Sequence, residues 1–142
     1  MSKCPFCTIL SRENPASIIY EDEGCTVFLD IHPVNPGHIL VVPNQHAASL
    51  AELDADTGPH LFRVAHRLVN VLRSSDIRCE GVNIFLADGE AAGQDVSHVH
   101  IHVIPRYEDD GFGLRFALNY PTNPSREELD TAAEQIRREV RH

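Results

Sequence analysis

Histidine occupies every second position between residues 98 and 102, and Val99 and Ile101 separate the three imidazoles. Alternation with a period of two predicts a strand over residues 97–104 whose histidines share one face. Residues on one face of a strand lie about 6.6 Å apart, so His98 and His102 start roughly 13 Å apart and three consecutive ligands to one metal are unfavourable. Two uses remain. One pair, such as His98 and His100, holds zinc with ligands from elsewhere, or the row lines a phosphate chain and one ring acts as nucleophile.

A second group able to do chemistry lies at residues 4–7, where Cys4 and Cys7 frame a Cys-Pro-Phe-Cys sequence. A C-x-x-C pair followed by distant histidines is typical of half a zinc site, and a similar pair occurs in thioredoxin-like redox motifs. The redox motif needs a strand before it, and we expect none, because only three residues precede Cys4. Zinc is therefore the favoured interpretation, and unligated thiols are the alternative.

The rest of the chain predicts the elements that position these groups. Short runs of β-branched and aromatic residues predict strands over 17–20, 25–29, 38–42 and 81–86 in addition to 97–104. Apolar residues with helical spacing predict an amphipathic helix over 61–72, capped by Asp54 or Asp56. Ser125 and Glu128 form a capping box that opens a last helix over 125–141, and residues 108–113 resemble a mobile loop. Strands with one inserted and one terminal helix predict an α+β domain around a mainly antiparallel sheet.

Composition restricts the partners. Lys plus Arg total 12 against 21 Asp plus Glu, for a net charge of −9. This balance argues against a nucleic acid or an anionic membrane as partner, because both require basic surfaces. No apolar run has the length of a membrane span, and the first residues lack the apolar segment of a secretory signal. We therefore predict a cytoplasmic protein.

Four segments together resemble one known family. The segment 98–104 (His-Val-His-Ile-His-Val-Ile) resembles the motif of the histidine triad (HIT) family of nucleotide hydrolases and transferases. Segments 28–31, 36–43 and 88–98 resemble that family's segments in the same order, so the likeness covers about residues 4–113. The resemblance implies a HIT-like fold in a single domain over 1–142, with a five-stranded mainly antiparallel sheet, one central and one C-terminal helix, and a homodimer.

The resemblance also implies a reaction. His100 would attack the α-phosphorus of a purine nucleoside phosphoramidate or related nucleotide and form a nucleotidyl-histidine that water hydrolyses. His102 would contact the phosphate or the leaving group, for which we expect a protonated ring. His38 would line the same phosphate pocket, and His98 would belong either to this catalytic group or to a metal site.

Binding roles follow from the same resemblance. Asp30 would accept hydrogen bonds from the ribose hydroxyls, and a set of apolar residues would form the slot for the base: Phe6, Ile9, Phe28, Leu29 and Ile31. Donors to the phosphate would come from Gly93, Gln94 and Ser97. Ala87 departs from the pattern, because the family commonly has Asn or Gln eleven residues before the first triad histidine. This departure puts substrate preference in question.

The resemblance implies a zinc site as well. In zinc-bearing relatives the first histidine of the motif joins a C-x-x-C and one more histidine, which here gives Cys4, Cys7, His46 and His98. Such a closed Cys₂His₂ set is structural.

Three other functions stay open at this point. They are a dinucleoside polyphosphate hydrolase of the Ap4A type, a non-catalytic nucleotide-binding sensor, and a metal-dependent hydrolase that uses the histidines as zinc ligands. A chelator separates the last from a covalent-histidine enzyme, because only the metal-dependent hydrolase would stop.

Overall fold

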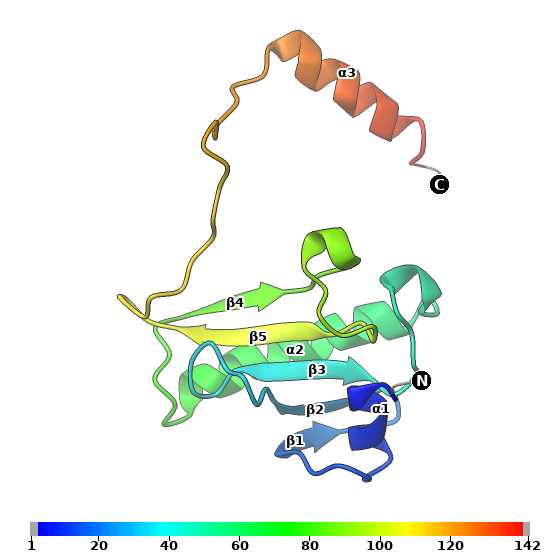
Figure 1. Ribbon diagram of the computed structural model, residues 1–142, viewed down its shortest axis with the longest axis vertical. Helices are drawn as coiled ribbons and strands as arrows, with labels where there is room; N and C mark the ends of the chain where they lie inside the picture. The colour runs from blue at the N-terminus through cyan, green and yellow to red at the C-terminus, as the bar shows by residue number, and fades with distance from the viewer. Residues whose placement is uncertain (1–2, 141–142) are drawn as a thin grey trace. The chain divides into compact units, whose positions relative to one another are not determined.

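The computed structural model describes residues 3–140, which fall into two units, the first ending at Phe112 and the second beginning at Gly113 (Figure 1). The first unit is an α+β structure, as predicted. Among residues 3–140 no helix is both long enough and apolar enough to cross a membrane. The predicted domain over 1–142 extends across both units and stays a prediction.

The first unit is built on one five-stranded antiparallel sheet with the order β1-β2-β3-β5-β4. Its strands are β1 (Ile18–Glu21), β2 (Cys25–Leu29), β3 (Ile39–Pro43), β4 (Gly81–Phe85) and β5 (Ile101–Arg106). All five predicted strands are present. The last is shorter than predicted, because β5 begins at Ile101 and residues 97–100 are irregular chain. The alternation of faces nonetheless continues across the boundary: Val99 is buried and Ile101 packs in the main core.

Helix α2 (Thr57–Ser74) covers one face of the sheet (Figure 1). Its apolar stripe packs on the side chains that β2, β3 and β5 direct to this face, and together they form the main core: Val27, Val41, Leu61, Ala65, Leu68, Leu72, Ile101 and Val103. The helix begins four residues before the predicted range. Asp56 occupies the N-cap position without a capping bond from its side chain, and Asp54 accepts hydrogen bonds from the backbone N–H and the hydroxyl of Thr57 instead.

The opposite face carries a helix that the sequence did not predict, α1 (Pro5–Leu10). Proline suits its first turn because an N–H at that position has no helical partner. Phe6 of α1 packs on Phe28, Leu40 and Val42, which alternate along β2 and β3 with the residues of the main core. The N-terminal cysteines therefore lie on the face of the sheet that α2 leaves uncovered.

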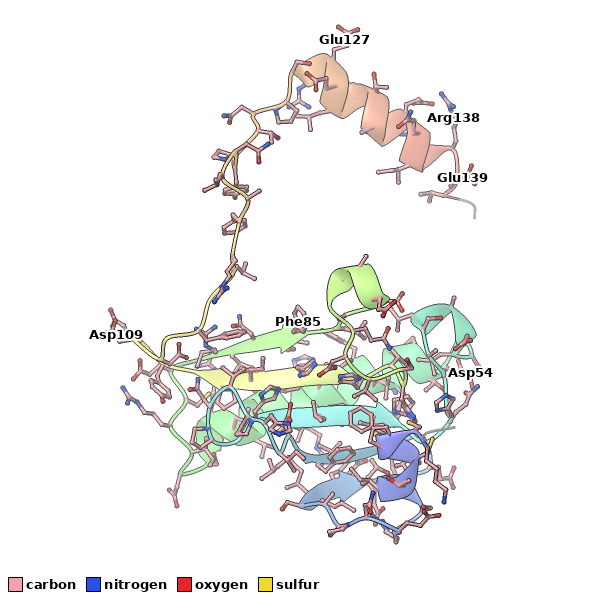
Figure 2. All side chains as sticks on the ribbon, in the orientation of Figure 1. Asp54, Phe85, Asp109, Glu127, Arg138 and Glu139 are labelled. Atoms are coloured by element: carbon pink, nitrogen blue, oxygen red, sulfur yellow. The ribbon has the colours of Figure 1, made fainter. Side chains whose placement is uncertain are left out.

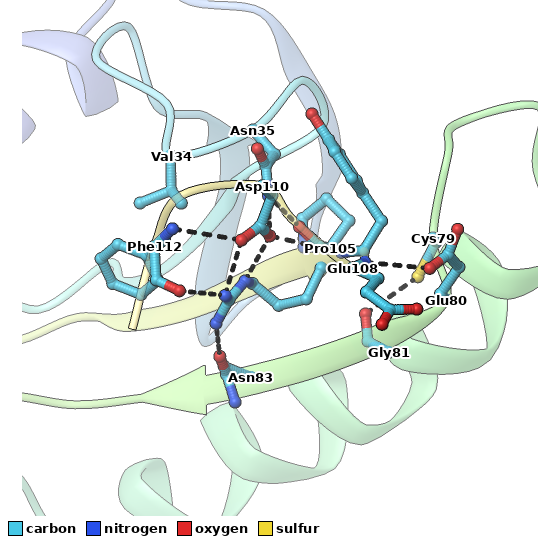
Figure 3. Close-up of polar contacts among 12 residues, drawn as sticks. Val34, Asn35, Cys79, Glu80, Gly81, Asn83, Pro105, Glu108, Asp110 and Phe112 are labelled. Atoms are coloured by element: carbon cyan, nitrogen blue, oxygen red, sulfur yellow. Dashed lines mark hydrogen bonds and ion pairs between the residues drawn. The ribbon is translucent and has the colours of Figure 1, made fainter. Parts of the chain in front are cut away.

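A polar cluster fixes the end of β5, where the sequence suggested a mobile loop. Both carboxylate oxygens of Asp110 accept hydrogen bonds from Arg106, at 2.6 and 2.8 Å, and one also accepts from the side-chain amide of Asn35 (Figure 3). Arg106 also donates to the carbonyl of Phe112. These bonds lower the pKa of Asp110 well below its usual range, the Arg106 guanidinium being the largest cause. Residues 106–112 are therefore anchored to the turn before β3.

The second unit contains helix α3 (Arg126–Arg137). The predicted capping box is present: the hydroxyl of Ser125 accepts from the N–H of Glu128, whose carboxylate accepts from the N–H of Ser125. The helix ends at Arg137, four residues before the predicted end, and residue 141 lies outside the described range. Figure 2 shows the side chains of both units.

Candidate functional site

The face of the sheet that carries α1 holds a cavity of about 460 Å³, here called the histidine cavity. One part is apolar, formed by Phe6 and Ile9 of α1 with the end of β2, and the other part is formed by imidazoles and carboxylates. It includes eight residues predicted for the site: Phe6, Ile9, Phe28, Leu29, Asp30, Ile31, His100 and His102. The apolar slot and the reactive groups therefore share one space.

The nucleophile predicted from the resemblance has a defined orientation. His100 is buried, and its Nδ1 lies 2.8 Å from the carbonyl oxygen of His98. A carbonyl only accepts hydrogen bonds, so Nδ1 carries the proton and donates it. The lone pair is then on Nε2, and an imidazole attacks through the nitrogen that carries its lone pair. The acceptor that orients this ring is a backbone atom, so no side-chain pattern could have revealed it.

His38 and His102 form a second oriented pair. The N–H of Val34 donates to His38 Nδ1 at 3.0 Å, which places the proton of His38 on Nε2. This proton is donated to His102 Nδ1 at 2.9 Å, and the proton of His102 is then on its own Nε2. His102 thus offers an N–H donor next to the lone pair of His100, whose ring centroid lies 4.8 Å away.

The surroundings of His102 in the free protein disfavour the protonated ring that the sequence suggested. Burial is the main cause that lowers the pKa of His102 to about 4, and His100 and His38 lower it further. Burial also lowers the pKa of His38, although Asp30, whose Oδ2 lies 3.6 Å from His38 Nε2, opposes this shift. At neutral pH both rings are neutral, and His102 donates a hydrogen bond as a neutral group.

His98 belongs to a different environment from the other two triad histidines. It is fully buried and does not line the cavity. Its Nε2 lies 2.9 Å from the carbonyl of Pro43 and donates to it, so that the lone pair is on Nδ1. This nitrogen lies 3.4 Å from Cys4 Sγ, 3.6 Å from Cys7 Sγ and 3.2 Å from His46 Nδ1. The four side chains Cys4, Cys7, His46 and His98 are called the thiol–imidazole cluster below.

The thiol–imidazole cluster has the donor set and spacing of a zinc site. All four ligand atoms lie within 4.8 Å of one another. Zinc held by two sulfurs at about 2.3 Å and two nitrogens at about 2.0 Å places its ligand atoms roughly 3.3–3.8 Å apart, close to the spacings here. Burial and the neighbouring Cys4 thiol raise the pKa of Cys7. The residues therefore fit a tetrahedral zinc ion that would displace the thiol protons.

The predicted phosphate donors are placed elsewhere. The side-chain amide of Gln94 donates to the carbonyls of Ala48 and Val96, and the N–H of Gly93 donates to Glu90. Both donors already have partners in this structure, Gly93 and Gln94 within their own loop and Gln94 also at Ala48, so their role as phosphate donors stays a prediction. Ser97 lines a separate cavity beside Cys4 and His46. Ala87 is buried and does not line the histidine cavity.

Sequence reasoning missed two residues next to the reactive histidines. Asp95 lines the histidine cavity, and its Oδ1 lies 3.6 Å from His100 Nε2. Phe85 of β4 pairs with His102 across the sheet, and the ring centroids lie 5.5 Å apart. Asp95 is adjacent to the predicted donor Gln94, which is the only signal that could have drawn attention to it. The position of Phe85 beside His102 could be recognised only from the pairing of β4 with β5.

Together the fold and the site define an α+β protein in which an antiparallel sheet presents oriented imidazoles to an apolar cavity. The chain belongs to the HIT domain family, whose model matches residues 11–109. It is similar to an uncharacterized HIT-like protein of Borreliella burgdorferi, with 41% identity over 81% of this chain and 84% of that protein. It is also similar to the adenylylsulfatase HINT3 of Arabidopsis thaliana, with 36% identity over 75% of this chain but only 54% of that protein.

Solved structures agree with this assignment. A HIT family member from Bacillus subtilis superposes with a TM-score of 0.88 and 32% identity, covering 99% of both chains. A histidine triad nucleotide-binding protein from Candida albicans superposes with a TM-score of 0.83 and 29% identity, covering 96% of both chains. A zinc-bound histidine triad protein from Mycobacterium smegmatis superposes with a TM-score of 0.74 and 37% identity, covering 96% of this chain and 97% of that one. The predicted family and the predicted HIT-like fold are confirmed.

Proposed function

We propose that the protein is a nucleotide hydrolase or nucleotidyltransferase that acts at the α-phosphate of purine nucleoside phosphoramidates. The observation that carries this proposal is the orientation of His100. Its Nδ1–H is bound to the His98 carbonyl, and Nε2 is left with a lone pair at the histidine cavity. The nucleotide-binding protein of Candida albicans and the plant adenylylsulfatase support nucleotides as the ligand class.

The reaction would proceed in two displacements at phosphorus. His100 Nε2 attacks the α-phosphorus, a new phosphorus–nitrogen bond forms, and the bond to the leaving amine breaks as that amine takes up a proton from solvent. The nucleotidylated ring is a cation that keeps its Nδ1–H on the His98 carbonyl. Water then attacks phosphorus, the phosphorus–nitrogen bond to His100 breaks, the proton lost by the water passes to solvent, and the neutral imidazole is restored. The neutral His102 Nε2–H would donate a hydrogen bond to a phosphate oxygen in both steps.

Recognition of the nucleoside would use the other part of the cavity. The rings of Phe6 and Phe28 pack edge to face with centroids 5.5 Å apart and form an apolar wall for a planar base. Asp30 already accepts the N–H of His32 on Oδ1 and has accepting capacity left for ribose hydroxyls. An apolar slot with few polar groups favours planar rings and discriminates weakly among them.

We propose zinc as a structural ion held by the thiol–imidazole cluster. When bound, the ion would cross-link the N-terminal residues of the chain to the segment before β5. Four protein ligands complete a tetrahedral shell, which leaves no position for substrate, and His98 faces away from the cavity. The zinc-bound relative from Mycobacterium smegmatis supports the choice of metal.

The decisive experiment looks for the covalent intermediate. The protein is mixed with adenosine 5′-phosphoramidate, quenched in alkali to preserve phosphorus–nitrogen bonds, and analysed by intact mass spectrometry. We expect an adenylylated protein that is absent from His100→Gly and present in His66→Asn, an exposed histidine on α2. Turnover by His100→Gly at the parent rate contradicts the proposal. Binding without product would instead indicate a nucleotide sensor, and adduct formation from diadenosine polyphosphate alone would indicate a dinucleoside polyphosphate hydrolase.

We further propose a homodimer. Strand β4 is at the edge of the sheet, and its Ile84 and Phe85 are 39% and 44% exposed, an apolar edge that a second copy would cover. Light scattering of the protein and of Ile84→Lys tests this, with a shift to the monomer expected for the variant. The cytoplasmic location and the absence of nucleic-acid and membrane partners stay predictions.

A further inference from the structure

The histidine cavity carries an unusual charge for a phosphate site. Its lining within residues 3–140 includes no lysine and no arginine. The charged groups of the lining are two carboxylates, Asp30 and Asp95, and they face the same space as the rings of His100 and His102. Phosphate-binding sites usually present arginine, lysine or a metal ion to the anion. This cavity is therefore poorly suited to a ligand with several negative charges.

Asp95 is the carboxylate closest to the reacting atom. Its Oδ1 lies 3.6 Å from His100 Nε2, too far for a strong hydrogen bond but close enough for its charge to act on a phosphorus attached there. The side chain is 76% exposed, and among the described residues it forms no ion pair with a lysine or an arginine. It also lines the neighbouring cavity beside Ser97, so it stands at the open side of the reacting centre. Asp30 is different, because it lies beside His38 and the apolar slot.

We propose that Asp95 is a specificity-determining residue that selects substrates by the charge of the leaving group. It favours leaving groups with a cationic amine, accepts neutral ones, and disfavours those that carry further negative charge, such as polyphosphates. This inference rests on the proposed function, because it assumes that a phosphoryl group is transferred to His100. The field of one carboxylate about 6 Å away in a partly hydrated site changes the preference between cation and anion about tenfold.

Three substrates isolate this effect. Adenosine 5′-phosphoramidates of ethylenediamine, n-propylamine and β-alanine have the same nucleotide and the same leaving atom, and their leaving groups are cationic, neutral and anionic. We expect kcat/KM of the parent to decrease in that order. In Asp95→Asn the ratio of kcat/KM for the cationic substrate to kcat/KM for the anionic substrate should fall about tenfold. The value of kcat/KM for the neutral substrate should stay within about twofold of that of the parent. High salt should reduce the ratio of the parent toward that of the variant.

The matched control is Glu90→Gln, which removes an exposed carboxylate from the same loop at a position that does not line the histidine cavity. It should leave the ratio unchanged. The inference is overturned if Asp95→Asn lowers all three values equally or leaves their ratio intact. If the parent turns over none of the three substrates, the proposed function is wrong. The preference for cationic over anionic ligands is then measured as the ratio of their dissociation constants. Equal affinities for the cationic and anionic ligands would then overturn the role of Asp95.

Discussion

The thiol–imidazole cluster and the histidine cavity contain neighbouring members of one histidine row, and the two rings are oriented in opposite ways. His98 donates from Nε2 to Pro43 and directs Nδ1 at two thiols, whereas His100 donates from Nδ1 to His98 and directs Nε2 at the cavity. Both rings are buried and both bond to a backbone carbonyl. The difference is which nitrogen meets that carbonyl. The backbone therefore leaves the lone pair of one imidazole facing the two thiols and that of the next facing the cavity.

The largest expected effect is at the cavity. Replacing His100 with glycine removes the proposed nucleophile, and we expect kcat to fall at least about 10³-fold, because the remaining groups would only bind and polarise the phosphate. Steady-state release of adenosine monophosphate measures this. Free imidazole should restore part of the activity in His100→Gly by occupying the vacated space. A variant as active as the parent would place the chemistry elsewhere.

Removing zinc tests the other region. If the ion is present at 1,000 times its dissociation constant, its loss lowers the free energy of unfolding by about 4 kcal/mol. Denaturant unfolding with and without chelator measures the change, and Cys7→Ser should reproduce it. Below the unfolding transition, turnover per folded molecule should stay within about twofold. If chelator abolished turnover while the protein stayed folded, the metal would be catalytic, and the two regions would not have separate roles.

Phe6 touches both regions and should affect both. Its ring centroid lies 5.8 Å from that of His98, 5.0 Å from that of His100 and 5.5 Å from that of Phe28. Phe6→Ala should lower the free energy of unfolding by about 3 kcal/mol and raise KM, since it opens the core under α1 and removes a wall of the slot. Phe62→Ala, at an exposed position on α2, serves as the control with little change. A change in KM without loss of stability would show that Phe6 serves only the slot.

The smallest expected effect is a loss of folding stability at low pH. The pKa of His102 is lowered from 6.5 to about 4, chiefly by burial, so between these values the unfolded chain binds more protons than the folded one. Stability should therefore be fully present above pH 6.5 and decrease as the pH falls, with about 2 kcal/mol lost at pH 5 from this group. Denaturant unfolding at pH 7 and pH 5 measures it. His102→Asn should lose correspondingly less, and an identical loss would assign the effect to other histidines.

Much of the fold could be predicted from the sequence, because the apolar periodicity of the strands and of α2 records which faces are buried. Helix α1 could not, since only six residues form it and its stability comes from Phe6 packing on β2 and β3. The shortened β5 was missed for a related reason. Residues 98–100 keep the alternation of faces, but their backbone and side chains bond outside the sheet, for example Val99 N–H to the carbonyl of Ala47.

Of the site, the reactive residue types could be predicted and their partners could not. Composition and spacing indicated His100, His102 and the cysteines, and the resemblance added His38 and Asp30. The proton positions depend on backbone groups of Val34 and His98, which any residue type supplies. The neutral state of His102 depends on burial, which appears only when β3 and β4 pair on either side of β5.

The clamp formed by Arg106, Asp110 and Asn35 has a consequence for how the molecule could be divided. It ends β5 and ties the chain to the turn that leads into His38, just before the boundary at Phe112 (Figure 3). A protease cut after this boundary would leave the strand bearing His102 with every bond described above. The clamp thus holds the last residues of the first unit on its sheet and marks Phe112 as the place to shorten the chain without removing one of those bonds.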